Sequence, residues 1–183
     1  MTVKQQWLVV LAIIALLGGG AFAASHFLKD ELTSVTVGSN APGFIVQTLD
    51  EPGRPKSLTD YRGDVVVLNI WATWCIPCRT EMPSMEALYK DLGPKGLKIV
   101  AVSVDDADAG QKIRDFVKEY GLTFEVLHDG TGSIQGIYRT TGVPETFVLD
   151  REGVIRKKWI GADDWASEGN RRLLEQLLAQ PKS

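Results

Sequence analysis

The amino-acid sequence predicts an α/β fold with a pair of parallel strands at its centre. Two apolar runs rich in β-branched residues, 65–71 and 96–104, read as buried strands. Between them, apolar residues recur at helical spacing up to Gly93-Pro94, which ends the pattern. Strand–helix–strand alternation is typical of parallel strands joined by a crossover helix. Both cysteines lie where the first strand passes into that helix.

Composition indicates one ordinary globular domain with an N-terminal extension. The chain has 183 residues, of which 44% are apolar and 23% charged. We expect an N-terminal segment at 1–28, a polar linker at 29–40 and a folded domain at 41–181. The net charge of −3 and the lack of a basic stripe argue against nucleic-acid binding.

The N-terminal segment has the length and apolar character of a membrane span. Residues 7–28 carry no Asp, Glu, Lys or Arg, and about 20 such residues cross a bilayer. Lys4 before the run and the acidic pair 30–31 after it favour a cytoplasmic N-terminus. We therefore expect a single-pass anchor in the cytoplasmic (inner) membrane, with the domain on the periplasmic or extracytoplasmic side. The alternative is a signal peptide cleaved after Ala23, which would release the domain into the periplasm. A buried core helix fits this run less well.

The remaining elements follow from apolar periodicity and turn residues. A strand at 44–49 and a second arm at 56–58 form a predicted hairpin that faces solvent, followed by a helical turn at 59–63. Beyond the central strands we expect, in order, a helix closed by Gly121, a strand at 124–128, a short helix at 133–138, strands at 144–149 and 154–160, and a closing helix from near Ser167 to before Pro181. The charged strand 154–160 reads as an edge strand.

The spacing Cys75-Ile76-Pro77-Cys78 predicts a reactive pair. A helix N-terminus carries free N–H groups and partial positive charge, which favour a thiolate at Cys75. Residues at i and i+3 of a helix are neighbours, so the two sulfurs suit a disulfide, and Pro77 is a typical helix-start residue. We expect Cys75 to be the exposed nucleophile and Cys78 the sheltered resolving thiol.

Two other interpretations of the cysteine pair are less favoured. A zinc site needs about four ligands, and the chain offers only these cysteines and the distant His26 and His128. A purely structural disulfide that closes so short a loop would stabilise little. Redox chemistry without a metal remains.

The run from Trp71 to Pro83, WATWCIPCRTEMP, resembles the active site of the TlpA/ResA/CcmG group of thioredoxin-fold, extracytoplasmic thiol–disulfide oxidoreductases. The resemblance covers about residues 38–180. It implies a thioredoxin-like fold, with a central mixed sheet flanked by helices and an added N-terminal hairpin. It also implies a redox-active Cys75–Cys78 disulfide and no other cofactor.

The resemblance extends to Val143-Pro144-Glu145. It implies that the Val143–Pro144 bond is cis and faces the cysteines, so that the Val143 backbone pairs with an extended substrate. The alternative is a trans proline on an edge strand. Glu145 either adds a carboxylate near the cleft or points to water.

Asn69 and Glu81 flank the cysteine pair in sequence. Asn69 occupies the position of a buried, titrating Asp in thioredoxin, and the TlpA/ResA group commonly has Asn there. Since Asn does not titrate, we expect it to bond the backbone beneath the site. Glu81 lies one helical turn beyond Cys78, where the resemblance implies a cleft carboxylate that disfavours thiolate and shuttles protons. The alternative is a solvated Glu.

Aromatic and apolar residues surround the pair. We expect Trp74, Ile76 and Pro77 to form a binding surface for protein partners, and Trp71 to belong to the core.

The resulting hypothesis is a membrane-tethered enzyme that reduces disulfides of exported proteins, with apocytochrome c as one candidate. Electrons would come from a membrane thiol transporter of the DsbD/CcdA kind. One alternative is a thiol peroxidase of the peroxiredoxin-like superfamily, whose usual Thr-x-x-Cys signature is missing because Thr73 is only two residues before Cys75. The other is a redox-inert module that binds protein or copper.

Overall fold

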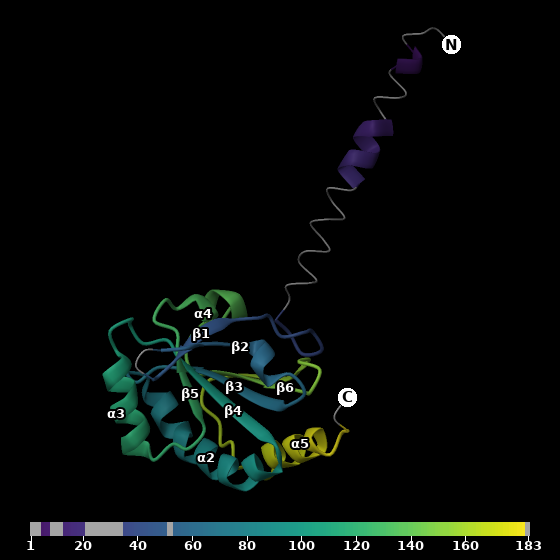
Figure 1. Cartoon of the computed structure of the whole chain (residues 1–183). Coiled ribbons are helices and arrows are strands. Elements are labelled where there is room, and N and C mark those ends of the chain that lie inside the picture. The colour runs from purple at the N-terminus through teal and green to yellow at the C-terminus, as the bar shows by residue number, and fades with distance from the viewer. Residues whose placement is uncertain (1–4, 8–12, 21–34, 51–52, 182–183) are drawn as a thin grey trace. The chain divides into compact units, whose positions relative to one another are not determined.

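The computed structural model describes residues 5–7, 13–20, 35–50 and 53–181 (Figure 1). Two units separate at residues 34 and 35. In the first, residues 5–7 and 13–20 are helical. No helix within the described ranges is both long and apolar enough to cross a bilayer. Most of the expected span at 7–28, and the first part of the expected linker, lie outside the described residues.

The second unit is built on a seven-stranded mixed sheet with the order β2-β1-β5-β4-β3-β6-β7. The strands are β1 (Ile45–Thr48), β2 (Pro55–Ser57), β3 (Val65–Trp71), β4 (Leu97–Ser103), β5 (Glu125–His128), β6 (Glu145–Leu149) and β7 (Ile155–Ile160). The three central strands β3, β4 and β5 run parallel, and the other pairs are antiparallel. The parallel pair β3–β4 confirms the sequence prediction, and β7 is an edge strand as expected.

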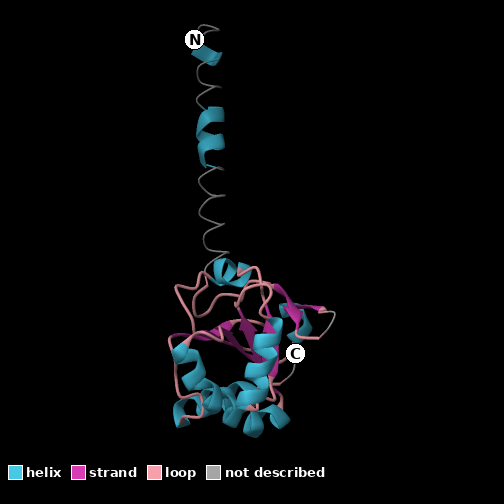
Figure 2. Cartoon of the chain, turned by 90° about the vertical axis from the view of Figure 1, so that its left-hand side faces the viewer, coloured by secondary structure: helices cyan, strands magenta, loops and turns pink. Residues whose placement is uncertain are grey.

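Helices cover both faces of the sheet (Figures 1 and 2). They are α2 (Ile76–Leu92), α3 (Gly110–Tyr120), α4 (Ser133–Tyr138), α5 (Glu168–Leu178) and the 3₁₀ helices η1 (Leu58–Tyr61) and η2 (Gly93–Lys95). Side chains alternate along a strand, so successive β3 residues enter different cores. Val65, Val67 and Trp71 pack with α2, α3 and α5, whereas Val66 and Leu68 pack with α4 and η1. Burial of β3 on both faces explains its continuous apolar run.

The N-terminal hairpin is part of the central sheet. β1 pairs antiparallel with β2 and, on its other side, with β5. Val46 is buried and Ile45 exposed, so only one face of β1 reaches water. The expected solvent-facing hairpin is therefore a two-stranded extension of the sheet.

Residues 35–40 are packed rather than linker-like. Val35 is buried, and the backbone N–H of Gly38 donates to the Ile155 carbonyl at 2.8 Å. Asn40 forms a bridge with Val154. The folded unit thus begins at residue 35, six residues before the predicted boundary, because polar residues here satisfy their backbone groups against the start of β7.

Candidate active site

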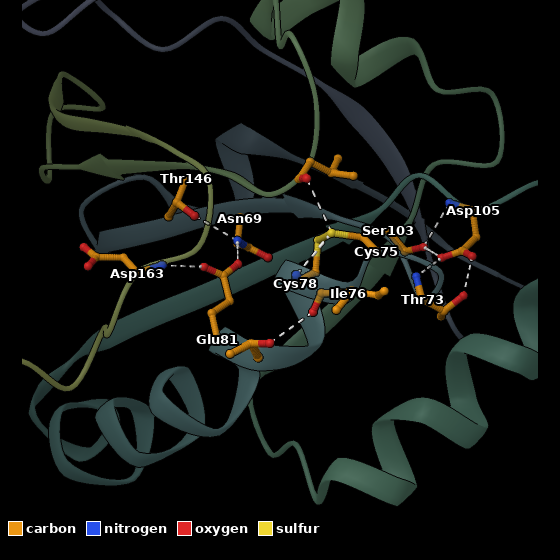
Figure 3. The surroundings of a disulfide bond; sticks show 12 residues. Asn69, Thr73, Cys75, Ile76, Cys78, Glu81, Ser103, Asp105, Thr146 and Asp163 are labelled. Carbon is orange, nitrogen blue, oxygen red and sulfur yellow. Dashed lines mark hydrogen bonds between the residues drawn. A yellow bond between two sulfur atoms is a disulfide. The ribbon is translucent and has the colours of Figure 1, made fainter.

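Cys75 and Cys78 form a disulfide at the N-terminus of α2 (Figure 3). Cys75 is the N-cap residue, and its sulfur accepts a hydrogen bond from the backbone N–H of Cys78 at 3.1 Å. Pro77 lies in the first turn, as the sequence predicts. Free N–H groups at a helix start stabilise negative charge, so the same geometry favours a thiolate at Cys75 after reduction.

The predicted contrast in exposure between the two cysteines is wrong for the disulfide state. Cys75 is only 4% exposed and Cys78 is 0% exposed. The carbonyl oxygen of Val143 lies 3.4 Å from the sulfur of Cys75 and covers it. Cys75 is still the more exposed of the two cysteines, and its sulfur lies beside the Val143 carbonyl.

The Val143–Pro144 peptide bond is cis, as the resemblance implies, and the trans alternative is wrong. Pro144 is buried, and its carbonyl accepts a hydrogen bond from the Gly161 N–H at 2.9 Å. The chain before β6 is thereby tied to the end of β7. One of the dashed lines at the Cys75 sulfur in Figure 3 marks its 3.4 Å contact with the Val143 carbonyl oxygen.

Glu81 is buried beneath the site, so the solvated interpretation is wrong. It is 1% exposed. Its Oε1 accepts from Asn69 Nδ2 at 2.9 Å, and its Oε2 accepts from Trp165 Nε1 at 3.2 Å and from the Asp163 N–H at 3.3 Å. Burial raises the pKa of Glu81 to about 7, and the three hydrogen bonds oppose this rise. A buried carboxyl group near neutral pKa can take up and release protons under physiological conditions.

Asn69 bonds side chains instead of the backbone. Its Nδ2 group donates to Glu81 and also to Thr146 Oγ1 at 2.8 Å. The expectation of backbone bonding is therefore wrong, because Asn69 shares its face of the sheet with Thr146, its paired residue on β6. Asn69 connects β3, β6 and α2 under the disulfide.

Glu145 does not point to water. It is buried, its Oε1 lies 2.9 Å from Lys158 Nζ, and its Oε2 accepts from the Thr141 N–H at 3.3 Å. Lys158 sits on the neighbouring strand β7, which offers a charge partner to a carboxylate that would otherwise be costly to bury. Glu145 thus holds the segment before β6 in place.

The apolar residues of the motif divide as predicted. Trp74 is 62% exposed and Ile76 is 76% exposed, and Pro77 is also exposed. Trp71 is fully buried and packs on Phe116 with ring centroids 4.7 Å apart. An exposed apolar rim next to a disulfide is suited to a protein partner.

Sequence reasoning missed the role of Asp105, at the end of β4. Its buried carboxylate accepts from the Thr73 N–H at 2.8 Å, the Thr73 hydroxyl and the Ser103 hydroxyl at 2.7 Å. Burial opposes ionisation of Asp105, but these hydrogen bonds outweigh it and hold its pKa below the usual range. Asp105 therefore fixes the loop that leads to Cys75. The bonding partner of Asp105, Thr73, lies 32 residues upstream, so the sequence around Asp105 carries no local signal of this role.

Metal binding has no support in the described part of the chain. Residues 35–50 and 53–181 hold no cluster of three or more His, Cys, Asp or Glu that could bind an ion. His128 Nε2 instead lies 3.1 Å from the Asp105 carbonyl and 3.2 Å from the Asp106 carbonyl.

Comparison with known proteins agrees with this geometry. The AhpC/TSA family model matches residues 37–158. The thiol-disulfide oxidoreductase ResA of Geobacillus thermodenitrificans is 38% identical over 156 residues, which cover 84% of this chain and 87% of the relative. The thioredoxin-like protein YneN of Bacillus subtilis is 38% identical over 158 residues, 86% of this chain and 91% of the relative.

A solved structure shares the fold. A protein assigned as thiol:disulfide interchange protein DsbE, from Chlorobium tepidum, superimposes with a TM-score of 0.65 at 31% identity. The match covers 79% of this chain and 96% of that protein. The expected thioredoxin-like arrangement of sheet and helices is confirmed.

Proposed function

The chain belongs to the ResA/CcmG-like family of thiol–disulfide oxidoreductases, and from this premise we propose that it reduces disulfide bonds of exported proteins outside the cytoplasm. The observation that carries the proposal is the Cys75–Cys78 disulfide at a helix N-terminus, beside the Val143 carbonyl. The protein supplies its own redox group and needs no bound cofactor for this reaction.

The reaction proceeds from the dithiol by two exchanges. The Cys75 thiolate attacks one sulfur of the substrate disulfide, forms a mixed disulfide and expels the other substrate sulfur as a thiolate. The Cys78 thiolate then attacks the Cys75 sulfur, closes the Cys75–Cys78 disulfide and releases the second substrate thiolate. Two electrons pass to the substrate, and two protons follow. Glu81 is placed to exchange one of these protons with Cys78, one turn away on α2.

Substrate recognition combines a backbone contact with an apolar surface. The Val143 carbonyl, next to the Cys75 sulfur, is placed to accept a hydrogen bond from an extended substrate segment. Trp74, Ile76 and Pro77 supply exposed apolar area beside it. Such a site fits a flexible chain around a cysteine, and unfolded apocytochrome c is one such substrate.

The proposed location of the protein rests on its N-terminal sequence. The uncharged run 7–28 anchors the chain in the cytoplasmic membrane, and the domain works on the extracytoplasmic side. In an oxidising compartment the disulfide must be reduced again from elsewhere. A membrane thiol transporter of the DsbD/CcdA kind would supply those electrons.

One assay compares this function with its rivals. The reduced full-length chain in detergent is given insulin, hydrogen peroxide or Cu(I) in separate reactions. We expect insulin reduction that Cys75→Ser abolishes. Peroxide consumption without insulin reduction would instead support the thiol peroxidase, and tight copper binding without turnover would support the binding module.

A further inference from the structure

The hydrogen-bond partners of Glu81 all donate. The indole Nε1 of Trp165 and the backbone N–H of Asp163 can only donate, and Asn69 presents its Nδ2 group. These surroundings suit a carboxylate. A protonated Glu81 has a hydrogen to donate, and it requires an acceptor that none of the three bonds provides.

Asn69 carries such an acceptor on its other amide atom. Its Oδ1 is buried and, within residues 35–50 and 53–181, has no hydrogen-bond partner. Half a turn of the amide exchanges Oδ1 and Nδ2 with almost no change in shape. The hydroxyl of Thr146, 2.8 Å from Nδ2, both donates and accepts, so it can bond either atom. Figure 3 shows Asn69 between Thr146 and Glu81, so a rotation of its amide would change the hydrogen bonds to both residues.

We propose that the side-chain amide of Asn69 rotates by half a turn when Glu81 changes protonation. In one orientation Nδ2 donates to the Glu81 carboxylate, and in the other Oδ1 accepts from the Glu81 carboxylic acid. Asn69 is then a positioning residue for proton transfer at the disulfide. Only the role of Asn69 in proton transfer rests on the proposed function. The amide rotation itself can be tested without a substrate.

Both forms of Glu81 occur near neutral pH, because burial raises its pKa to about 7. The negative charge of Asp163 also raises the pKa of Glu81, and Asp163 Oδ2 lies 3.4 Å from Lys157 Nζ. Cys78 lies one turn earlier on α2. In the oxidised protein the cysteines do not titrate, so a pH change acts on Glu81 without interference from them.

Nuclear magnetic resonance of the oxidised full-length chain, in detergent, tests the proposal directly. The pH is varied from about 5 to about 9, a range that spans the titration of Glu81. The ¹³Cδ chemical shift of Glu81 reports its protonation state. Above the midpoint, the Asn69 side-chain NH₂ protons should show nuclear Overhauser effects to Glu81 and Thr146. Below the midpoint these effects should disappear together. Effects that persist on both sides of the midpoint would overturn the proposal, and this arm needs no variant.

Two variants add independent outcomes. In Glu81→Gln, Oε faces the two fixed donors and the amide N–H faces Asn69, so Asn69 should keep the rotated orientation at every pH. Asn69→Leu removes a donor from the carboxylate and an acceptor from the acid, so the Glu81 midpoint should rise by less than the about one to two pH units that a fixed Nδ2 donor would cause. Thr146→Val is the matched control, because it leaves both Asn69 orientations able to bond Glu81, and it should also move the midpoint little. An unrotated Asn69 in Glu81→Gln, or a rise of about two units in Asn69→Leu, would contradict the proposal.

Discussion

Replacing Glu81 by Gln should remove a specific pH dependence from the stability of the oxidised protein. The pKa of Glu81 rises from 4.5 in a model compound to about 7 in the fold, because the side chain is buried. Between these values the folded state holds a proton that the unfolded state has lost, so stability falls as the pH rises. Each pKa unit corresponds to 1.36 kcal/mol, which gives a loss of about 3 kcal/mol from pH 4.5 to pH 7.

The assay is denaturant unfolding of the oxidised full-length chain at several pH values, followed by tryptophan fluorescence. The free energy of unfolding of the parent minus that of Glu81→Gln should fall by about 3 kcal/mol across this window and then level off. Taking the difference removes the contribution of other titrating groups. Glu86→Gln is the control: Glu86 is a buried carboxylate of the same helix, bonded to Thr123. A flat difference for Glu81→Gln, or the same slope in Glu86→Gln, would refute the reasoning.

Two further substitutions test other parts of the site. Asp105→Ala should lower the free energy of unfolding by about 2–4 kcal/mol at neutral pH, because it leaves buried donors of Thr73 unpaired. The loss should shrink as the pH falls below 3.8, the ordinary pKa of an Asp side chain, toward the lower pKa of Asp105 in the fold, and exposed Asp106→Ala should show neither effect. Trp74→Ala should lower kcat/KM at least about tenfold for insulin but not for a small aromatic disulfide, with stability within about 0.5 kcal/mol. Ile45→Ala, exposed on β1, is its control, and an equal loss for both disulfides would exclude a partner surface at Trp74.

The elements that the sequence predicts well are those with a strong local pattern. β3 reads as a strand because it is buried on both faces, and α2 because its apolar residues recur at helical spacing before Gly93-Pro94. The junction between these two elements holds the cysteines. Its chemistry could therefore be predicted from one continuous stretch.

The contacts that define the site's electrostatics come from distant parts of the chain. Glu81 bonds Trp165, 84 residues away, and Asn69, 12 residues away. Glu145 on β6 is buried beside a charge partner, Lys158, from the adjacent strand β7. No local pattern distinguishes such carboxylates from solvated ones, so their burial had to come from the structure.

The exposure of Cys75 was also beyond sequence reasoning. The helix N-terminus predicts its reactivity, but the Val143 carbonyl that covers its sulfur comes from a loop 68 residues downstream. Chemistry set by the local backbone was predictable here, and access set by tertiary packing was not.

Trapping of mixed disulfides tests the central claim, that Cys75 attacks and Cys78 resolves. The full-length Cys75→Ser and Cys78→Ser variants, each reduced, are mixed with a protein disulfide, quenched with acid and analysed by mass spectrometry. We expect Cys78→Ser to accumulate a mixed disulfide through Cys75, and Cys75→Ser to accumulate little, because Cys78 is fully buried behind Cys75. Equal trapping by both variants, or trapping only through Cys78, would contradict the account.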